Sequence, residues 1–260
     1  GGPGRNVPVN VAAPTGGKAW QIRRTAGHWR ATPIIWIAGP AMPLEIKLKD
    51  GSVLAFPTPI VRYQAPEAEA VNPRLREIVL ARAVAEEGIR RSNVGGWHSK
   101  DDLLEWNEPE IQVFKRWIQG GARRMLQILS AEKGAAQQGE LQVVAWANVS
   151  RQGDYNKIHN HPGCSFSGVY YVDVGQPDPE AHETGYIEFL EPRLGADMIE
   201  LPGSPFGGKH KVEPENGLML VFPAWLYHYV NPYHGPGERI SIAFNITVKS
   251  FGPKGGSQTK

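Results

Sequence analysis

The sequence predicts an α+β fold in which helices pack against a β-sandwich or barrel formed mainly by the C-terminal half. Three observations support this fold class. The 260 residues include 30 glycines and 22 prolines spread along the chain, which is typical of many turns between short strands. Apolar residues at helical spacing occur only in the middle of the chain. From Glu140 onward, runs rich in valine, isoleucine and aromatic residues alternate with turn residues.

Composition bounds the class of protein. Hydrophobic residues at 41% and charged residues at 21% are ordinary for a soluble globular chain and exclude a wholly disordered one. A net charge of +2 is too small to argue for a nucleic-acid partner, and we expect none. No apolar run reaches the roughly 18–20 residues that cross a bilayer, so we expect no membrane partner and a cytoplasmic location. The single cysteine, Cys164, excludes an internal disulfide framework.

Composition also divides the chain into three parts. Residues 1–18 are rich in glycine, proline and alanine and predict a flexible tail. Residues 19–52 predict a β-rich N-terminal extension. Residues 53–250 form the main domain, with a barrel core at about 140–250. Short β-like runs separated by glycine or proline lie in and beside the extension, at Ile34–Ile37, Leu44–Leu48 and Val53–Phe56.

Two helices are expected at the start of the main domain. Asn72-Pro73 places a capping residue before a proline at the first helical position, and Gly88 closes the segment. A second helix is expected to start near Pro109. Its apolar positions fit a buried stripe that Gly120-Gly121 weakens in the middle: Ile111, Phe114, Trp117, Ile118, Met125 and Ile128.

Five strands are expected after residue 140. They are rich in β-branched and aromatic residues and are bounded by turn residues. Their ranges are Leu141–Asn148, Ser165–Val174, Tyr186–Leu190, Leu218–Phe222 and Arg239–Val248.

Three histidines have the spacing of a metal site. His159 and His161 sit at i and i+2 just before a predicted strand, and such residues point the same way, roughly 6.5–7 Å apart. His228 follows the apolar strand that ends before Pro223. Three ligands on one face leave coordination positions open for substrate, cosubstrate and O2. Imidazole suits iron, copper, nickel or zinc, so the ligand type alone does not name the metal.

A possible carboxylate site follows on the last predicted strand. Arg239 and Ser241 share one face of that strand, so a guanidinium and a hydroxyl point together into the barrel. This pair suits a carboxylate, because arginine makes bidentate charge-assisted hydrogen bonds. An arginine on an inward face is costly without an anionic partner.

With these motifs the chain resembles the Fe(II)/2-oxoglutarate-dependent oxygenases, and more narrowly a family of oxygenases of uncharacterised substrate. The resemblance covers about residues 53–249. Four segments carry it: Phe56–Pro59, Ser92–Ser99, His159–Tyr171 and Phe222–Asn245. It implies a double-stranded β-helix (jelly-roll or cupin-like) barrel with supporting helices. It also implies a non-haem Fe(II) cofactor, 2-oxoglutarate as cosubstrate and use of O2.

The resemblance assigns roles to the motif residues. His159, His161 and His228 are implied to hold the metal, and Arg239 and Ser241 to hold 2-oxoglutarate. One departure matters, since His161 stands where the superfamily usually has a carboxylate. We favour His161 as the third ligand, with a nearby carboxylate such as Glu188 as the alternative.

Further pocket residues are expected on the same grounds. Tyr171, the second tyrosine of a Tyr-Tyr pair, resembles the residue that binds the distal carboxylate of 2-oxoglutarate in prolyl hydroxylases, and Asn148 is expected to line the same pocket. Four polar and aromatic residues in a glycine-flanked loop are expected to contact substrate as a lid: Asn93, Trp97, His98 and Ser99.

The implied function is hydroxylation of a small molecule or an amino-acid or peptide-like substrate, with release of succinate and CO2. Desaturation and ring formation are open outcomes, and the sequence identifies neither the substrate nor the oligomeric state. One alternative is a cupin-like three-histidine dioxygenase or isomerase that does not use 2-oxoglutarate. A second alternative is a non-catalytic metal-binding module.

Overall fold

The structure is a computed structural model. The residues it describes are 9–11, 19–25, 28–34, 56–130, 137–196 and 208–253. They fall into two compact units, Gly1–Ala55 and Phe56–Lys260.

The first unit contains a three-stranded antiparallel sheet of β1 (Val9–Val11), β2 (Ala19–Thr25) and β3 (His28–Ile34). Strand β1 lies in the segment 1–18, which was predicted to be a flexible tail, and pairs with β2, which follows that segment. The remaining tail residues and the predicted run Leu44–Leu48 lie outside the described residues.

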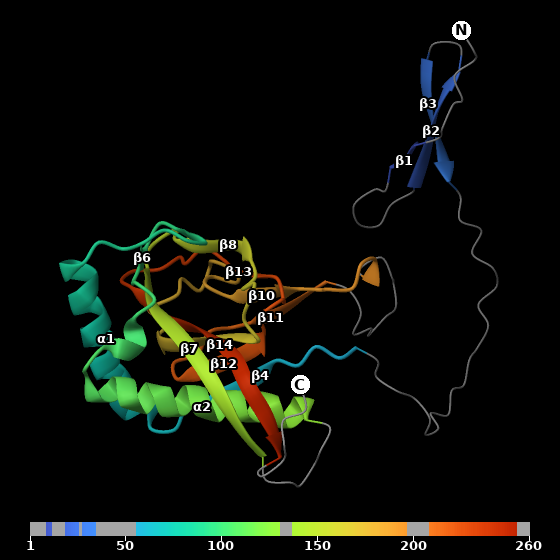
Figure 1. Ribbon diagram of the computed structural model, residues 1–260. Coiled ribbons are helices and arrows are strands. Elements are labelled where there is room, and N and C mark those ends of the chain that lie inside the picture. Colours follow the sequence, from blue (N-terminus) through green and yellow to red (C-terminus); the bar gives the residue numbers. More distant parts are fainter. Residues whose placement is uncertain are drawn as a thin grey trace, which may run out of the picture. The chain divides into compact units, whose positions relative to one another are not determined.

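The second unit is built from two antiparallel sheets (Figure 1). The six-stranded sheet has the order β4-β12-β9-β14-β7-β6 and the five-stranded sheet the order β11-β10-β13-β8-β5. The strands of the larger sheet are β4 (Val61–Gln64), β12 (Leu218–Pro223), β9 (Phe166–Asp173), β14 (Arg239–Pro253), β7 (Gln137–Ser150) and β6 (Trp97–His98). Those of the smaller sheet are β11 (Lys209–Val212), β10 (Ile187–Leu190), β13 (His228–Val230), β8 (Tyr155–His159) and β5 (Asn93–Val94).

Helices α1 (Ala68–Ala85) and α2 (Pro109–Leu129) cover the larger sheet, with a single 3₁₀ turn, η1 (Leu103–Glu105), before α2. A large apolar core fills the space between the helices and this sheet. A smaller core joins the two sheets and contains Tyr171, Phe189, Leu220 and Phe222. The predicted α+β architecture of helices on a β-barrel is confirmed.

Helix α1 begins five residues earlier than predicted, so Pro73 lies inside it rather than at its first position. Glu67 precedes the helix in a left-handed conformation, with φ 60°. Asn72 does not cap the helix, because its Oδ1 accepts a hydrogen bond from the buried hydroxyl of Tyr170 at 2.5 Å. Packing against the sheet therefore decides where this helix starts. The helix lacks one backbone hydrogen bond at Pro73, because proline has no N–H group.

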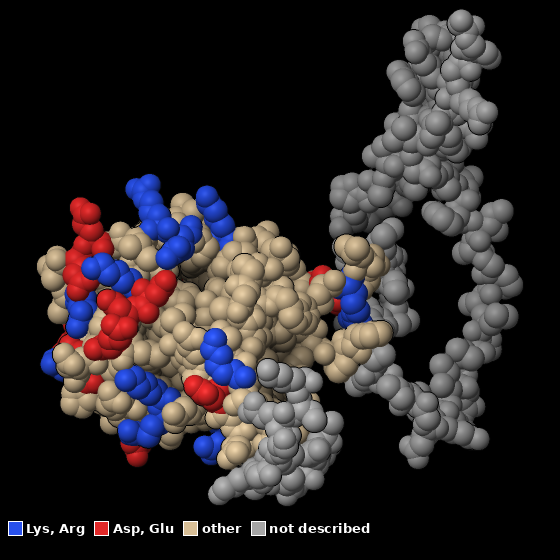
Figure 2. All heavy atoms as spheres, viewed as in Figure 1, with Lys and Arg blue, Asp and Glu red and all other residues tan. Residues whose placement is uncertain are grey.

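Helix α2 begins at Pro109, as predicted. Gly121 lies where the helix approaches β12, and a Cβ at this position would be 2.9 Å from Cγ2 of Val221. The glycine that weakens the helix thus permits close packing on the sheet. In the described part of the chain, no helix combines the length and hydrophobicity that a bilayer span requires. On the face shown in Figure 2, acidic and basic side chains of the second unit are interspersed.

Candidate active site

Three histidines meet at one end of the smaller sheet. His159 is the last residue of β8, and His228, the first residue of β13, is its direct partner in the antiparallel register. The loop after β8 carries His161, whose backbone N–H donates to the carbonyl of Ala224 at 2.9 Å. One potential ligand atom from each ring lies within 4.8 Å of the others. The two-residue spacing of His159 and His161, together with the β8–β13 pairing, therefore brings the three imidazole rings close to one another.

Hydrogen bonds set the tautomers of two of these rings. Nδ1 of His159 lies 2.7 Å from the carbonyl of Lys157, and Nδ1 of His228 lies 2.9 Å from the carbonyl of Leu226. A carbonyl accepts only, so each Nδ1 carries the proton and each Nε2 keeps its lone pair. Such a backbone bond is the usual way to orient a metal-binding imidazole.

Burial keeps the three imidazoles neutral. It lowers the pKa of His228 to about 3 and that of His161 to about 4, and the neighbouring His159 adds to both shifts. The pKa of His159 is also lowered by burial. Neutral imidazole is the form that coordinates a metal ion, so the three residues fit a divalent cation.

Glu188, the alternative third ligand, faces away from the histidines. Its neighbour Phe189 pairs with His228, and successive residues of a strand point to opposite faces. The Glu188 carboxylate instead accepts hydrogen bonds from Tyr229 at 2.5 Å and Asn231 at 2.7 Å, and lies 3.2 Å from Nζ of Lys209. Glu188 is therefore a structural carboxylate on the outer face of the smaller sheet. This orientation argues against the alternative in which Glu188 is the third metal ligand.

A second polar cluster forms on the inner face of the larger sheet. Ser241 of β14 pairs with Asn148 of β7 on one side and with Tyr171 of β9 on the other. Arg239 lies two residues earlier on β14, with its guanidinium carbon 5.2 Å from the centre of the Tyr171 ring. The strand register thus brings together the four residues that were predicted to bind 2-oxoglutarate.

This cluster contains buried polar atoms without a partner. Arg239 is 3% exposed, and its Nη2 donates to the carbonyl of Gly185 at 3.1 Å, but its Nε has no hydrogen-bond partner. The hydroxyl of Tyr171, whose pKa burial raises to about 12, also lacks one. Within the described residues, Arg239 makes no ion pair with an acidic side chain. A buried cation beside an unpaired hydroxyl has the donor set for a carboxylate ligand.

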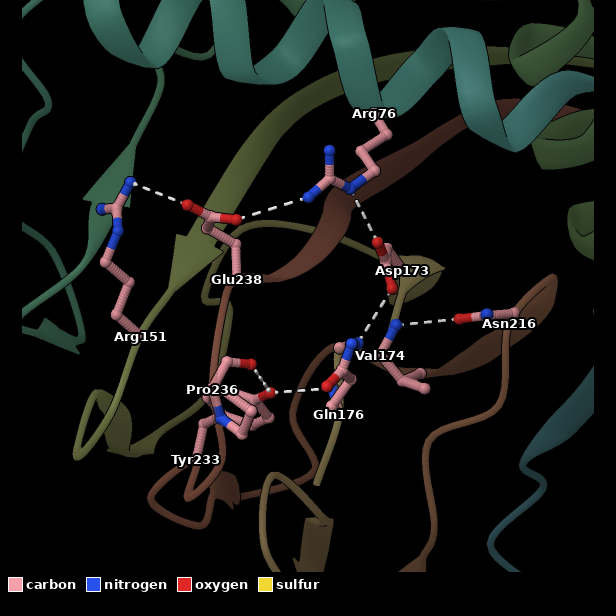
Figure 3. A network of polar contacts seen from close by, with 10 residues as sticks. Arg76, Arg151, Asp173, Val174, Gln176, Asn216, Tyr233, Pro236 and Glu238 are labelled. Carbon is pink, nitrogen blue, oxygen red and sulfur yellow. Dashed lines mark hydrogen bonds and ion pairs between the residues drawn. The ribbon is translucent and has the colours of Figure 1, made fainter. Parts of the chain in front are cut away.

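A network of charged residues holds the strand ends behind this cluster (Figure 3). From α1, Arg76 donates to Asp173 at the end of β9 at 2.8 Å and to Glu238 just before β14 at 3.3 Å. Glu238 also lies 3.6 Å from Nη2 of Arg151, which follows β7. The network therefore ties together the ends of three neighbouring strands, β9, β14 and β7, immediately beside Arg239.

One cavity joins the two clusters. Its lining includes the three histidines and the four predicted 2-oxoglutarate residues. Lining residues that were not predicted include Ser92, Trp146 and Asn156. Trp146 shares its strand face with Asn148, so alternation along the predicted strand contains the signal that finds it. Ser92 reaches the cavity only through the β5–β8 pairing, which no local pattern reveals.

The predicted substrate loop contributes less to this cavity than expected. Asn93 bonds within its own turn, to the amide of Arg91 and the carbonyl of Gly95. The indole of Trp97 donates to the carbonyl of Glu86. Neither residue lines the cavity.

The other two residues of the predicted loop lie against β7. The Ser99 hydroxyl accepts a hydrogen bond from the Ala147 amide at 3.0 Å and has a supporting role. The buried ring of His98 stacks on Trp146 at 5.5 Å and 9°. His98 therefore reaches the cavity wall through Trp146, while the cavity lining includes neither His98 nor Ser99.

Comparison with solved structures identifies the fold. A prolyl-4-hydroxylase from Pseudomonas putida is 17% identical, with a TM-score of 0.50 over 74% of this chain and 93% of that chain. SnoN, a non-heme alpha-ketoglutarate-dependent epimerase from nogalamycin biosynthesis, is 12% identical, with a TM-score of 0.52 over 75% and 80%. SnoK, a carbocyclase from the same biosynthesis, is 14% identical, with a TM-score of 0.51 over 76% and 83%. The predicted double-stranded β-helix fold is confirmed.

The chain therefore combines a double-stranded β-helix fold with a three-histidine cluster that could hold a metal ion. Residues 144–245 match the family model described as "Putative 2OG-Fe(II) oxygenase". The match agrees with the resemblance that the motifs predicted, and the cofactors that this family's description implies are Fe(II) and 2-oxoglutarate. A comparison with curated protein sequences finds no match.

Proposed function

We propose that this oxygenase hydroxylates a small molecule or an amino-acid or peptide-like substrate and converts 2-oxoglutarate to succinate and CO2. One observation carries the proposal. The cavity that holds three neutral imidazoles also holds a buried arginine without an anionic partner, and a carboxylate cosubstrate supplies that anion.

In this proposal His159, His161 and His228 bind the metal. Each ring offers a lone pair, and the ring-to-ring distances of 4.4 to 5.2 Å leave the three nitrogens room to share one ion. Bound Fe(II) supplies the chemistry that couples O2 reduction to decarboxylation of 2-oxoglutarate and oxidation of the substrate. The chain supplies the coordination geometry and a half-buried cavity beside it.

Arg239, Tyr171 and Ser241 bind the distal carboxylate of 2-oxoglutarate. The guanidinium makes the charge-assisted contact, and the hydroxyls of Tyr171 and Ser241 donate to the same group. Because burial holds the pKa of Tyr171 at about 12, its hydroxyl stays protonated and remains a donor at neutral pH. Asn148, opposite Ser241 across the sheet, adds an amide to the same end of the cavity.

Hydroxylation is the proposed outcome, because one of the structural neighbours described above is a prolyl hydroxylase. Two others are an epimerase and a carbocyclase. The change made to the substrate must therefore be tested separately from the use of 2-oxoglutarate. A half-buried aromatic wall at Trp146, 6.1 Å from the His161 ring, suits a compact substrate with an apolar or planar portion.

Succinate formation tests the proposal. The protein is incubated with Fe(II), O2 and carbon-13-labelled 2-oxoglutarate, and labelled succinate is measured by mass spectrometry with and without candidate substrates. We expect succinate to form in an iron-dependent manner and Arg239→Met to abolish it. O2 consumption that proceeds equally without 2-oxoglutarate contradicts the proposal and favours the cupin-like three-histidine enzyme. Iron binding without any turnover favours the non-catalytic module.

A further inference from the structure

The hydroxyl of Ser92, next to His159, lines the cavity and has no role in the proposed function so far. Ser92 lies just before β5, and its Oγ is 3.4 Å from Nε2 of His159. Its backbone carbonyl accepts a hydrogen bond from the Lys157 amide at 2.9 Å, which fixes the residue against β8. The hydroxyl is therefore held beside a nitrogen that the proposed function assigns to the metal.

The neighbouring hydrogen bonds decide where the Ser92 proton points. Nδ2 of Asn156 donates to the Ser92 Oγ at 3.2 Å and so occupies one of its lone pairs. The hydroxyl proton is not used in that bond and remains free to be donated. Because Nδ1 of His159 is already a donor, its Nε2 is the acceptor for that proton when no metal is bound.

Metal binding removes this acceptor. Once Nε2 of His159 coordinates an ion, its lone pair is engaged, and among the described residues the Ser92 hydroxyl donates no other hydrogen bond. A donor left without an acceptor in a half-buried cavity is unfavourable, so an oxygen atom of a bound ligand becomes its natural partner.

Resting on the proposed function, we propose that Ser92, oriented by Asn156, donates a hydrogen bond to the metal-chelating end of 2-oxoglutarate. The cosubstrate is then held at both ends, by Arg239 and Tyr171 at the distal carboxylate and by Ser92 beside the metal. Ser92 is thus a further binding residue of the oxygenase, and Asn156 is its positioning residue.

An anaerobic titration tests this role without turnover. The Kd for 2-oxoglutarate is measured from the charge-transfer absorption band of the Fe(II)-loaded protein. We expect Ser92→Ala to weaken 2-oxoglutarate about tenfold, the size of a lost hydrogen bond to a charged acceptor, with the Fe(II) affinity within about twofold of wild type. Ser92→Thr keeps the hydroxyl and is expected to stay within about twofold of wild type.

Ser165→Ala is the matched control. It deletes a serine hydroxyl that accepts from the Val248 amide and does not line the cavity, so it leaves the 2-oxoglutarate Kd unchanged. An unchanged Kd in Ser92→Ala, or a loss as large in Ser92→Thr as in Ser92→Ala, overturns the inference. Should Ser92→Ala not fold, Ser92→Cys keeps an atom in place with a weaker donor and carries the same expectation.

The two proposals fail in different ways. If wild-type protein shows no 2-oxoglutarate band, or one that Arg239→Met leaves unchanged, the proposed function fails. If the wild-type band depends on Arg239 but not on Ser92, only the role of Ser92 is overturned.

Discussion

Buried polar groups on the outer face of the smaller sheet have hydrogen-bond partners, whereas some of those that face the cavity from the larger sheet do not. On the outer face the Glu188 carboxylate, 2% exposed, receives hydrogen bonds from Tyr229 and Asn231 and an ion pair from Lys209. Across the cavity from the inner face, Arg239 and Tyr171 are as deeply buried, yet each keeps a polar atom without a partner. A satisfied network serves the fold, whereas unsatisfied donors that converge on a cavity indicate a ligand. Substitutions of Glu188 and of Arg239 should therefore have opposite effects on stability and on ligand binding.

The largest expected effect is on metal affinity. His228→Ala and His161→Ala each remove one of three ligands, and we expect each to weaken Fe(II) binding at least about 100-fold. Isothermal titration calorimetry under anaerobic conditions measures this. His182→Ala, which removes an exposed histidine outside the cluster, is the matched control and should bind Fe(II) like wild type. Wild-type affinity in His161→Ala would contradict the three-histidine assignment.

Arg239→Met separates ligand binding from stability. We expect 2-oxoglutarate binding to weaken at least about 100-fold, because a charge-assisted clamp is lost. The free energy of unfolding of the ligand-free protein should rise by about 1–2 kcal/mol, because an apolar chain replaces a buried cation that has no ion-pair partner. Urea denaturation and calorimetry check the two parts. A destabilised Arg239→Met protein would mean that the arginine serves the fold.

Glu188→Gln is expected to behave in the opposite way. Burial opposes ionisation of Glu188, but hydrogen bonds from Tyr229, Asn231 and Lys209 outweigh it and lower its pKa. Loss of the charge should destabilise the metal-free protein by about 1–2 kcal/mol at neutral pH, because Lys209 is half exposed and the ion pair is partly screened. Affinities for Fe(II) and 2-oxoglutarate should not change.

The pH dependence of this stability difference follows from the sign of the shift. A carboxyl with a lowered pKa in the folded state stabilises the protein above its unfolded pKa, about 4.3 for glutamate. That stabilisation is lost as the pH falls through the folded pKa. Lys211, a further charged group near Glu188, has a raised pKa because of its hydrogen bond to Glu183 and stays protonated throughout this range. The stabilities of wild type and Glu188→Gln measured by urea denaturation should therefore begin to converge as the pH falls below about 4.3 and coincide below the folded pKa of Glu188. A constant difference would argue against an ionic role.

The sequence contains most of the proposed site, because its geometry follows from strand alternation. The spacing of His159 and His161 and the shared face of Arg239 and Ser241 depend only on a period of two along a strand. What alternation cannot supply is the pairing of strands distant in sequence. The outward direction of Glu188 depends on the β10–β13 register, and the place of Ser92 on the β5–β8 pair.

Tertiary packing explains the other differences. Pro73 is a strong local signal for the start of a helix, but α1 extends through it because Asn72 is engaged by Tyr170 of the core. Side chains of the predicted lid likewise form hydrogen bonds with backbone groups instead of facing the cavity. Ser99 bonds to β7 and Trp97 to the end of α1, and neither contact has a sequence signature.

The most direct test of the account is the anaerobic absorption titration of the Fe(II)-loaded protein with 2-oxoglutarate. We predict a charge-transfer band that saturates with 2-oxoglutarate in wild type and in Glu188→Gln, and that Arg239→Met removes at the same ligand concentrations. Absence of the band in wild-type protein that binds Fe(II), or a band of equal affinity in Arg239→Met, would contradict the claim that the unpaired arginine and the three histidines form one cosubstrate site.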